Sequence, residues 1–436
     1  MLRTVGPSSA PASQQAQAGD PVGYTARPAP KLMTRILVTV ALGMLLMMSG
    51  AAAKEIGPEE ALCPAIASLG PGEELVLEPG MYRGPCAISS SGQAGNPITI
   101  RAKDPRQPPT IAYDGARANV FDIAGSHIVI RDLEFGPTKP DVDAIRLRNV
   151  EDIVIENCRF SEVGGISIVA ASGRGVVIRG NEISHPRATA VYLGCHNGDC
   201  FLTDLLVENN YIHDVSAPPG AVGYGLQVKL NSVAVIRDNV VVNTKGPGIM
   251  VYGARDPLAQ TIVERNFVAR ARTSSGIVIG GGPVLLRNNI TIGSADYGIA
   301  LEDYQRRGLL RRIVVAHNTA HGNVRGAIGM PERAVVEARI LNNALHSHGG
   351  FGPEPPTPPG VVQRGNVNCS IAVPCFRDPQ AFDFSPVGMP HSPWPADLDL
   401  VGDDYYGRRR GDPAIPGAIQ QEAPPIELGI KPRPSS

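Results

Sequence analysis

The hexamer Val207-Glu208-Asn209-Asn210-Tyr211-Ile212 is followed 29 residues later by a second hexamer of the same pattern, Ile236-Arg237-Asp238-Asn239-Val240-Val241. Each hexamer has Asn in its fourth position, followed by two strand-forming residues. The chain carries this Asn seven times, at spacings of 29, 29, 27, 23, 29 and 25 residues: Asn181, Asn210, Asn239, Asn266, Asn289, Asn318 and Asn343. A period in this range, built on short apolar segments, indicates a solenoid of stacked coils.

A shorter pattern precedes each hexamer and indicates that the coils are built from strands. It alternates apolar and variable residues, as in Leu226-Gln227-Val228-Lys229 and Ile249-Met250-Val251-Tyr252. An alternation with period two is typical of a strand that buries one face. The aligned Asn side chains can pair between coils, and this pairing satisfies buried polar groups that would otherwise cost about 1–3 kcal/mol each.

We therefore predict an all-β fold, a right-handed parallel β-helix with an N-terminal capping helix and an irregular C-terminal tail. A β-sandwich is the alternative. That fold needs tight hairpin turns, and the Asn-Gly pair in the repeats, Asn197-Gly198, lies in an insertion. The alternation also predicts a strand at Ile166-Ser167-Ile168-Val169, with Ser167 facing outward.

Composition divides the chain into four parts. Residues 1–53 form an N-terminal extension and signal peptide, because Lys31 and Arg35 precede an apolar run at 36–48 and small residues follow it. A retained membrane anchor is the alternative, although these 13 residues are few for a bilayer span. Residues 54–110 form the N-terminal cap and first coil, residues 111–350 the β-helix, and residues 351–436 a Pro-rich segment that packs partly on the helix and ends in disorder. Translation starts at either Met1 or Met33.

Composition and charge also limit the partners. The 436 residues include 49 Gly and 40 Pro with 5% aromatic residues, which is turn-rich but not disordered. Residues 1–53 hold four basic residues and one acidic residue, so the mature chain keeps 36 basic and 40 acidic residues. This balance predicts no nucleic-acid partner. We expect a periplasmic or secreted monomer that has no membrane contact after signal cleavage.

Seven cysteines suit an oxidising compartment. Cys158 falls on the Asn ladder position, so we expect a buried free thiol there. The remaining six predict three disulfides: Cys195–Cys200, Cys369–Cys375 and Cys63–Cys86. A metal site that includes His196 is the alternative to the first of these, but no second Cys/His pair stands at zinc spacing.

Two further stretches carry a family resemblance. The cap residues Asn96-Pro97-Ile98-Thr99-Ile100 resemble the opening of the alginate lyase and chondroitinase B group. The segment Asp403-Asp404-Tyr405-Tyr406-Gly407-Arg408 is similar to the closing segment of many secreted β-helix proteins. Over residues 60–350 the chain resembles the pectate-lyase-like superfamily of right-handed parallel β-helix proteins, which are mostly exported polysaccharide lyases, hydrolases and epimerases. The resemblance implies a polysaccharide substrate, bound along the first sheet.

Polar side chains on the outward positions of that sheet concentrate near the middle of the solenoid. Lys229 and Tyr252 follow the strands of adjacent coils, which stack about 4.8 Å apart, so we expect them to be neighbours. The long insertion between Val191 and Leu226 borders them. We predict that Lys229 and Tyr252 are catalytic, and that substrate is bound by the following residues: Gln227, Arg255, Arg148, Tyr192 and Glu302.

This pair suits β-elimination on a uronic acid. The reaction removes the proton next to a carboxylate, so it needs a base with a lowered pKa and an acid for the leaving oxygen. In the resembling lyase group a Lys at this kind of outward position is the base, and Tyr252 stands where the group has an Arg. The paired Glu calcium ligands of the group are replaced by Gly223 and Tyr224. The resemblance thus suggests Ca²⁺ without supplying its ligands, and Glu302 with Asp303 is the alternative metal candidate.

The same residues also allow purely structural, non-catalytic interpretations. The Lys229 stem packing on the Tyr252 ring would be a purely structural contact. Arg255 can pair with Asp256 in its own turn, and His213-Asp214 follows a ladder Asn as ordinary turn residues do. A basic loop favours polyanionic glycans or is merely solvated: Arg306, Arg307, Arg311 and Arg312.

The sequence predicts an exported polysaccharide lyase or C5-epimerase that acts on a polyuronate. A non-catalytic glycan-binding β-helix is the alternative. A glycoside hydrolase ranks third, because it needs clustered Asp or Glu residues that the outward positions do not offer.

Overall fold

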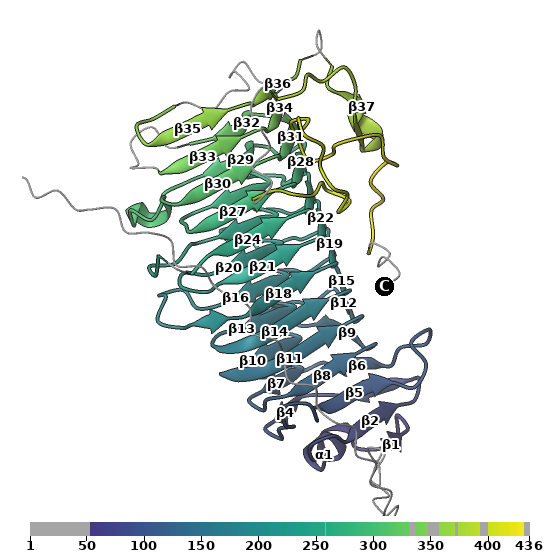
Figure 1. The fold of residues 1–436 in the computed structure, drawn as a ribbon. Coiled ribbons are helices and arrows are strands. Elements are labelled where there is room, and N and C mark those ends of the chain that lie inside the picture. The colour runs from purple at the N-terminus through teal and green to yellow at the C-terminus, as the bar shows by residue number, and fades with distance from the viewer. Residues whose placement is uncertain are drawn as a thin grey trace, which may run out of the picture. The chain divides into compact units, whose positions relative to one another are not determined.

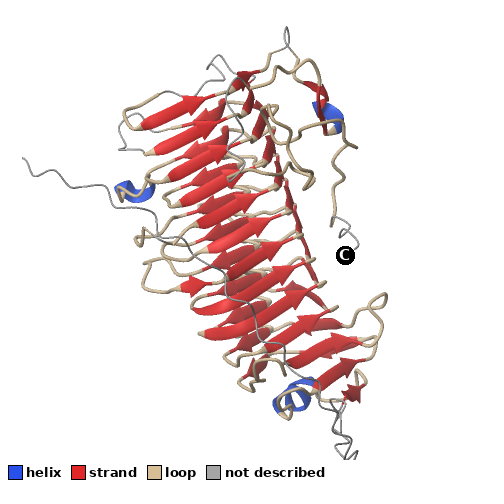
Figure 2. Cartoon of the chain, in the orientation of Figure 1, coloured by secondary structure: helices blue, strands red, loops and turns tan. Residues whose placement is uncertain are grey.

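The computed structural model describes residues 53–257, 259–330, 337–347, 357–370, 374–392 and 400–430. The coils from β2 to β32 each contribute strands to three parallel sheets, which we call A, B and C (Figure 1). Figure 2 shows that strands and loops make up almost all of the structure. The prediction of a right-handed parallel β-helix is confirmed. The predicted signal peptide and the last six residues, 431–436, lie outside the described residues.

The strands of each sheet follow one another in chain order. Sheet A contains β1 (Ala53–Ile56), β2 (Glu74–Leu77), β5 (Ile98–Ala102), β8 (Ile128–Arg131), β11 (Val150–Glu156), β14 (Gly173–Arg179), β17 (Leu202–Thr203), β18 (Leu205–Glu208), β21 (Ala234–Arg237), β24 (Thr261–Glu264), β27 (Val284–Arg287), β30 (Ile313–Ala316), β33 (Ala338–Leu341) and β35 (Val361–Arg364). Sheet B contains β3 (Met81–Arg83), β6 (Thr110–Tyr113), β9 (Glu134–Thr138), β12 (Arg159–Ser161), β15 (Glu182–Ser184), β19 (Tyr211–His213), β22 (Val240–Val242), β25 (Phe267–Ala269), β28 (Ile290–Ile292), β31 (Thr319–Asn323), β34 (Ala344–Ser347) and β36 (Val367–Asn368). Sheet C contains β4 (Cys86–Ile88), β7 (Phe121–Ile123), β10 (Ile145–Leu147), β13 (Ile168–Ala170), β16 (Val191–Leu193), β20 (Leu226–Val228), β23 (Ile249–Val251), β26 (Ile277–Ile279), β29 (Tyr297–Leu301) and β32 (Gly326–Gly329).

The register of one strand in sheet C differs from the sequence prediction. Ile168, not Ile166, pairs with Ile145 on one side and Val191 on the other. Val169 therefore takes the outward position, and Ser167 is fully buried at the corner before the strand. An alternation with period two cannot distinguish two registers that differ by two residues. The backbone hydrogen bonds to the neighbouring coils decide between them.

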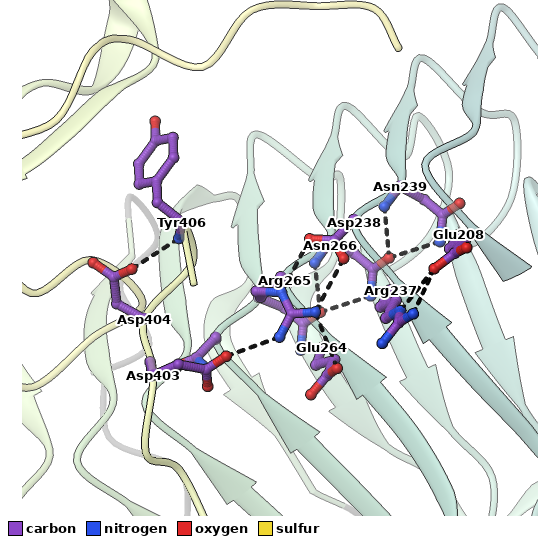
Figure 3. Close-up of polar contacts among 12 residues, drawn as sticks. Glu208, Arg237, Asp238, Asn239, Glu264, Arg265, Asn266, Asp403, Asp404 and Tyr406 are labelled. Carbon is purple, nitrogen blue, oxygen red and sulfur yellow. Dashed lines mark hydrogen bonds and ion pairs between the residues drawn. The ribbon is translucent and has the colours of Figure 1, made fainter. Parts of the chain in front are cut away.

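The Asn ladder lies at the corner between sheets A and B. The side chains of its members are fully buried. Asn181 Oδ1 accepts one hydrogen bond, from the Cys158 N–H, and from Asn210 to Asn343 each amide oxygen accepts two from the preceding coil. The backbone N–H and the Nδ2 of Asn239, for example, donate to Asn266 Oδ1 at 3.1 and 2.9 Å (Figure 3). Asn366, which the sequence analysis did not include, extends the ladder by accepting from Asn343 at 3.0 Å. The repeat thus continues past residue 350 to β36.

The N-terminal end of the solenoid is closed by a short helix, α1 (Leu62–Ala67). Leu62, Ile66 and Leu69 are buried in the same apolar core as the first coils, as the predicted helical face requires. A disulfide between Cys63 and Cys86 joins α1 to β4. Strand β1 extends sheet A at this end by pairing with β2.

The C-terminal segment packs against the outer face of sheet B, as expected for its apolar and aromatic anchors. This segment includes β37 (Phe376–Asp378), the single turn η2 (Pro379–Ala381) and β38 (Asp383–Pro386). The segment and sheet B share one buried apolar cluster. The segment contributes Phe376, Phe384, Tyr405 and Ile419, and the outward face of β22, β25 and β28 contributes Val240, Val242, Phe267 and Ile290. In Figure 1 the yellow segment lies beside β22, β28 and β31.

Polar contacts fix the same segment to the Asn corner. Arg265 donates to Asp403 at 2.9 Å (Figure 3). Asn288, the residue before the ladder Asn289, is also fully buried. Its Nδ2 donates to the Asp403 carbonyl at 2.9 Å, and its Oδ1 accepts from Arg410 at 2.6 Å. Only the folded chain brings the segment near residue 403 over Asn288.

The three predicted disulfides are present, and Cys158 is a buried free thiol. The Cys195–Cys200 bridge excludes a thiolate metal site in that loop. Three disulfides fit an oxidising compartment such as the periplasm or the cell exterior. In the described part of the chain, none of the helices has the length and apolar character of a membrane span.

We predict that Asn239→Leu lowers the free energy of unfolding by about 1–3 kcal/mol, because the N–H and Nδ2 of Asn210 lose their shared acceptor. Denaturant unfolding measures this change. Asn209→Gly is the control. Asn209 has a positive φ of 53°, and Gly180 holds the equivalent place one coil earlier with a φ of 64°. Equal losses in the two variants would contradict a specific role for the ladder.

Candidate functional site

Lys229 lies directly after β20, on the outward face of sheet C. Only 4% of the residue is exposed, and its Nζ lies 3.9 Å from the ring centroid of Tyr252 and 5.3 Å from that of Tyr192. Among the described residues no carboxylate pairs with this ammonium group. Burial, and to a lesser extent the positive charge of Arg307, lowers the pKa of Lys229 to about 8. About a tenth of Lys229 is therefore neutral at pH 7 and able to accept a proton, and this fraction grows as the pH approaches 8.

The ring face of Tyr252 contacts the Lys229 ammonium group, and the Tyr252 hydroxyl makes a separate hydrogen bond. That hydroxyl donates to the Tyr224 hydroxyl at 3.2 Å. Tyr252 is 1% exposed, and burial, followed by this hydrogen bond, raises its pKa well above the usual value. Tyr224 is only partly buried. The two hydroxyls thus form a chain from the buried Tyr252 toward the surface.

Three loops hold these residues in place. Lys245 anchors the loop at 216–223, because its Nζ donates to the carbonyls of Ala217, Pro218 and Ala221 at 3.2, 2.9 and 2.7 Å. Asn231 anchors the disulfide loop by donating to the Gly198 carbonyl at 2.8 Å. These are the insertions that the sequence analysis placed beside Lys229.

The third loop follows β29 and contains the single turn η1 (Tyr304–Arg306). Asp303 closes it by accepting from the Gly308 N–H at 2.9 Å. The ring of Tyr304 meets that of Tyr252 edge to face at 4.7 Å. Leu309 is buried in the same cluster as Tyr252 and Met250. This loop therefore covers part of the outward face of sheet C that adjoins Lys229.

Arg307 adds a second cation to this loop. Its guanidinium lies over the Tyr304 ring at 5.3 Å, and its Nη2 donates to Gln305 at 2.6 Å. Its Nη1 is buried and has no hydrogen-bond partner in the described structure. A buried guanidinium N–H without a partner is costly, and an anionic ligand would satisfy it. The sequence pointed to this residue only as one member of a basic loop.

Two of the predicted substrate-binding residues adjoin Lys229. Tyr192 is half-buried and pairs across coils with Gln227. Gln227 is 3% exposed, and its Nε2 donates to Thr189 at 3.3 Å. Its Oε1 is buried without a hydrogen-bond partner. The polar floor beside Lys229 thus has an acceptor to offer a ligand.

The other predicted residues lie farther along the sheet or at its rim. Arg148 follows β10, three strands from β20, and binds Asp122 through two contacts of 2.5 and 2.7 Å. Arg255 is exposed in the turn after β23, where its N–H donates to Asn231 at 3.0 Å. Glu302 is exposed after β29, two strands from β23. These residues lie beyond the Lys229 contacts.

Glu302 and Asp303 are adjacent in sequence, but they do not belong to a convergent group of ligands. Where the structure describes the chain, two sets of three His, Asp or Glu side chains bring their ligand atoms within 4.8 Å of one another: His185, His213 and Asp214, and His127, Glu151 and Asp152. Asp303 is instead used by its own loop.

A cleft of about 960 Å³ lies elsewhere, between the Asn corner and the C-terminal segment. Five of its charged lining residues form ion pairs with one another. Arg237 binds Glu208 at 2.7 Å, and Arg265 binds Asp238 at 3.0 Å (Figure 3). Its walls therefore resemble a packed junction, and the unpaired cations at Lys229 and Arg307 make the stronger candidate site.

Comparison with known proteins agrees with this architecture. Residues 143–223 and 203–355 match the family model described as the right handed beta helix region. The match covers just under half of the chain and agrees with the parallel β-helix that the structure shows. No curated protein sequence matches this β-helix significantly.

Solved structures support the β-helix fold at low sequence identity. A PL6 family polysaccharide lyase from Pseudopedobacter saltans superposes with a TM-score of 0.51 at 13% identity, over 87% of this chain and 99% of that chain. The structure of XylC with xylose superposes with a TM-score of 0.52 at 10% identity, over 68% of this chain and 76% of that chain. At such identities the likeness concerns the fold alone.

We predict that Lys229→Met stabilises the protein at pH 7. The fall in the pKa of Lys229 from 10.5 to about 8 corresponds to a destabilisation of about 3 kcal/mol. This cost is complete below pH 8, where Lys229 is charged in both states, and it disappears as pH rises toward 10.5, where the unfolded chain also loses the proton. Urea unfolding at pH 7 and pH 9.5 should show a gain that shrinks at the higher pH.

Lys245→Met is the matched control for this measurement. Lys245 is partly exposed and makes three hydrogen bonds, so its replacement should not stabilise the fold. A Lys229→Met variant that is less stable than the wild type at both pH values would contradict the buried, unpaired state of Lys229.

Proposed function

We propose that this β-helix is an exported, carbohydrate-active enzyme that cleaves a uronate-containing polysaccharide by β-elimination, or epimerises it at C5 through the same first step. One observation carries the proposal. Lys229 is a buried amine that pairs with no carboxylate among the described residues, its pKa is lowered to about 8, and it lies among tyrosines on an outward sheet face. Bases with such properties are typical of sites that remove a proton next to a carboxylate.

The substrate carboxylate is assigned to Arg307. Its Nη1 has an unused hydrogen bond, and the two cations provide positive charge for the enolate that forms when the C5 proton leaves. Arg255, at the rim of the coil that follows the Lys229 coil, is a further contact for the carboxylates of neighbouring sugars. Ca²⁺ has no assigned role in this scheme.

Proton transfer proceeds from C5 to the neutral amine of Lys229. In the lyase the C4–O bond then breaks, and the leaving oxygen takes a proton from the hydroxyl chain of Tyr252 and Tyr224. In the epimerase a proton returns to the opposite face of C5 instead. Tyr224 is the partly exposed member of the chain, so it is the direct donor, and Tyr252 supports it. Tyrosine faces also offer stacking surfaces for sugar rings.

The fold neighbours support a carbohydrate ligand. One is a polysaccharide lyase, and another was solved with xylose. The disulfides fit the periplasm or the cell exterior, where polysaccharides are met. We propose that the mature protein begins near Lys54 and acts there as a monomer.

The second candidate is a glycan-binding β-helix without catalysis. The contact of Lys229 Nζ with the Tyr252 ring face at 3.9 Å favours it, because a cation on an aromatic ring is also a stable packing arrangement. A glycoside hydrolase is disfavoured, since the described residues that contact Lys229 are aromatic and include no pair of carboxylates.

Activity of the variants tests the proposal. Absorbance of the unsaturated product on alginate, pectate and glycosaminoglycan measures the lyase, and proton exchange at C5 measures the epimerase. Lys229→Ala should lower kcat by about 10²–10⁴-fold without unfolding, because the general base is removed. Tyr252→Phe should lower kcat more than it raises KM, and Arg307→Ala should chiefly raise KM.

The wild-type rate should rise about tenfold per pH unit up to about pH 8, as Lys229 loses its proton.

Arg148→Ala is the matched control, because Arg148 is bound to Asp122 and lies three strands away. Wild-type turnover in Lys229→Ala would exclude this mechanism. Binding of polyuronates by the wild type without turnover would instead establish the non-catalytic candidate.

A further inference from the structure

A group of metal-binding side chains lies on the outer face of sheet B, away from Lys229. His213 is the last residue of β19, and Asp214 follows it at the corner. His185 holds the equivalent corner one coil earlier, after β15. The ligand atoms of these three residues lie within 4.8 Å of one another. We propose that His185, His213 and Asp214 bind a divalent transition-metal ion of the Zn²⁺ class.

The stacking of the coils creates this arrangement. Ser184 pairs with His213 in the parallel register of β15 and β19, so the corner residues that follow them, His185 and Asp214, are adjacent. His185 Nε2 lies 3.7 Å from Asp214 Oδ2, and His213 Nδ1 lies 2.7 Å from the same oxygen. Two imidazoles and one carboxylate therefore converge on a single point. This is a common ligand set for Zn²⁺ and related ions, with positions left for water.

Neighbouring side chains orient the ligands as in known metal sites. Glu182 Oε1 lies 3.5 Å from His213 Nε2, on the side of the ring opposite Asp214, at ion-pair distance and without a hydrogen bond in the described structure. Asn243, one coil later, donates to Asp214 Oδ1 and leaves Oδ2 for the metal. The ring of Tyr211 stacks on that of His213 at 4.2 Å. A carboxylate behind a ligating imidazole fixes the orientation of the ring and raises its basicity.

The site is open to solvent, and cysteine thiolates do not compete with it for the metal ion. His185 is exposed, whereas His213 and Asp214 are partly buried. The C-terminal segment covers β22 and later strands of sheet B (Figure 1). Tyr211 of β19 packs against the edge of that cluster, and β15 contributes no residue to it. Six of the seven cysteines are in disulfides and Cys158 is buried, so thiolates do not compete for the ion.

The second convergent group shows what a less suitable set looks like. His127 Nδ1 lies 3.2 Å from Asp152 Oδ2, but Glu151 in that group is bound by Arg174. An arginine on a ligand carboxylate opposes the charge of an incoming cation. In the first group the carboxylate of Asp214 contacts only imidazole and amide groups among the interactions of the described residues.

Titration calorimetry of the tag-free, chelator-treated full chain with Zn²⁺ tests the site. The wild type should bind one equivalent at this position, and Ca²⁺ should not substitute, because hard cations prefer oxygen ligands. His185→Ala and Asp214→Asn should each weaken binding by at least about tenfold, and Glu182→Gln by about 10–100-fold. Asp214 has a positive φ of 56°, which Asn tolerates, so that variant keeps the fold.

His127→Ala is the matched control and should leave this equivalent of Zn²⁺ in place. As a second readout, Zn²⁺ should raise the melting temperature of the wild type but not of Asp214→Asn. Absence of Zn²⁺ binding by the wild type at micromolar concentration, or wild-type affinity in both His185→Ala and Asp214→Asn, would overturn the proposal. Both readouts are independent of polysaccharide cleavage, so their outcome does not depend on the function of Lys229.

Discussion

The hydrogen bonds of the Asn ladder are the constraint on which the structure depends. From Asn181 to Asn366 the turns between sheets A and B carry amide side chains into the interior, where an unpaired amide is costly. The ladder resolves this by sharing. Asn239 Oδ1 accepts both the N–H and the Nδ2 of Asn210, and Asn239 in turn donates twice to Asn266. The Asn donors of one coil find their acceptor, the Oδ1 atom, only in the next coil. Each coil therefore requires the next one in a fixed register.

That fixed register turns the outward positions into columns of equivalent residues. On sheet A the last outward position alternates in charge, which gives ion pairs between coils such as Arg179–Glu156 at 2.6 Å and Arg237–Glu208 at 2.7 Å. On sheet B the outward position is apolar over β22 to β28, and the C-terminal segment covers it. Sheet C carries the tyrosines and Lys229. One backbone repeat thus supports three chemically different faces, since the ladder leaves the outward side chains free to vary.

The Lys229 cluster also illustrates how a protein can lose some stability and gain a chemically reactive side chain. A buried amine without a carboxylate destabilises the fold, and the same burial lowers its pKa to about 8. The rest of the molecule offsets this cost easily, because a long solenoid adds a nearly constant increment of core with each coil. Arg307 is held in a comparable state, with a buried N–H that lacks a partner. Such groups are rare in a core and concentrate where ligands bind.

The sequence by itself determined the repeat, the class of fold and the approximate place of Lys229 and Tyr252. It could do so because an alternation with period two and a recurring Asn are local patterns that survive without knowledge of the packing. The three cysteine pairs were also readable, since their spacing or their place beside the cap is visible in the chain.

The tertiary structure alone decided three further features. It set the register of β13, which a shift by two residues leaves equally well patterned. It covered Asn288 with a segment more than a hundred residues away in sequence. It also brought Tyr224, Tyr304 and Arg307 toward Lys229, and His185 toward Asp214, because insertions and corners from different coils meet only when the coils stack.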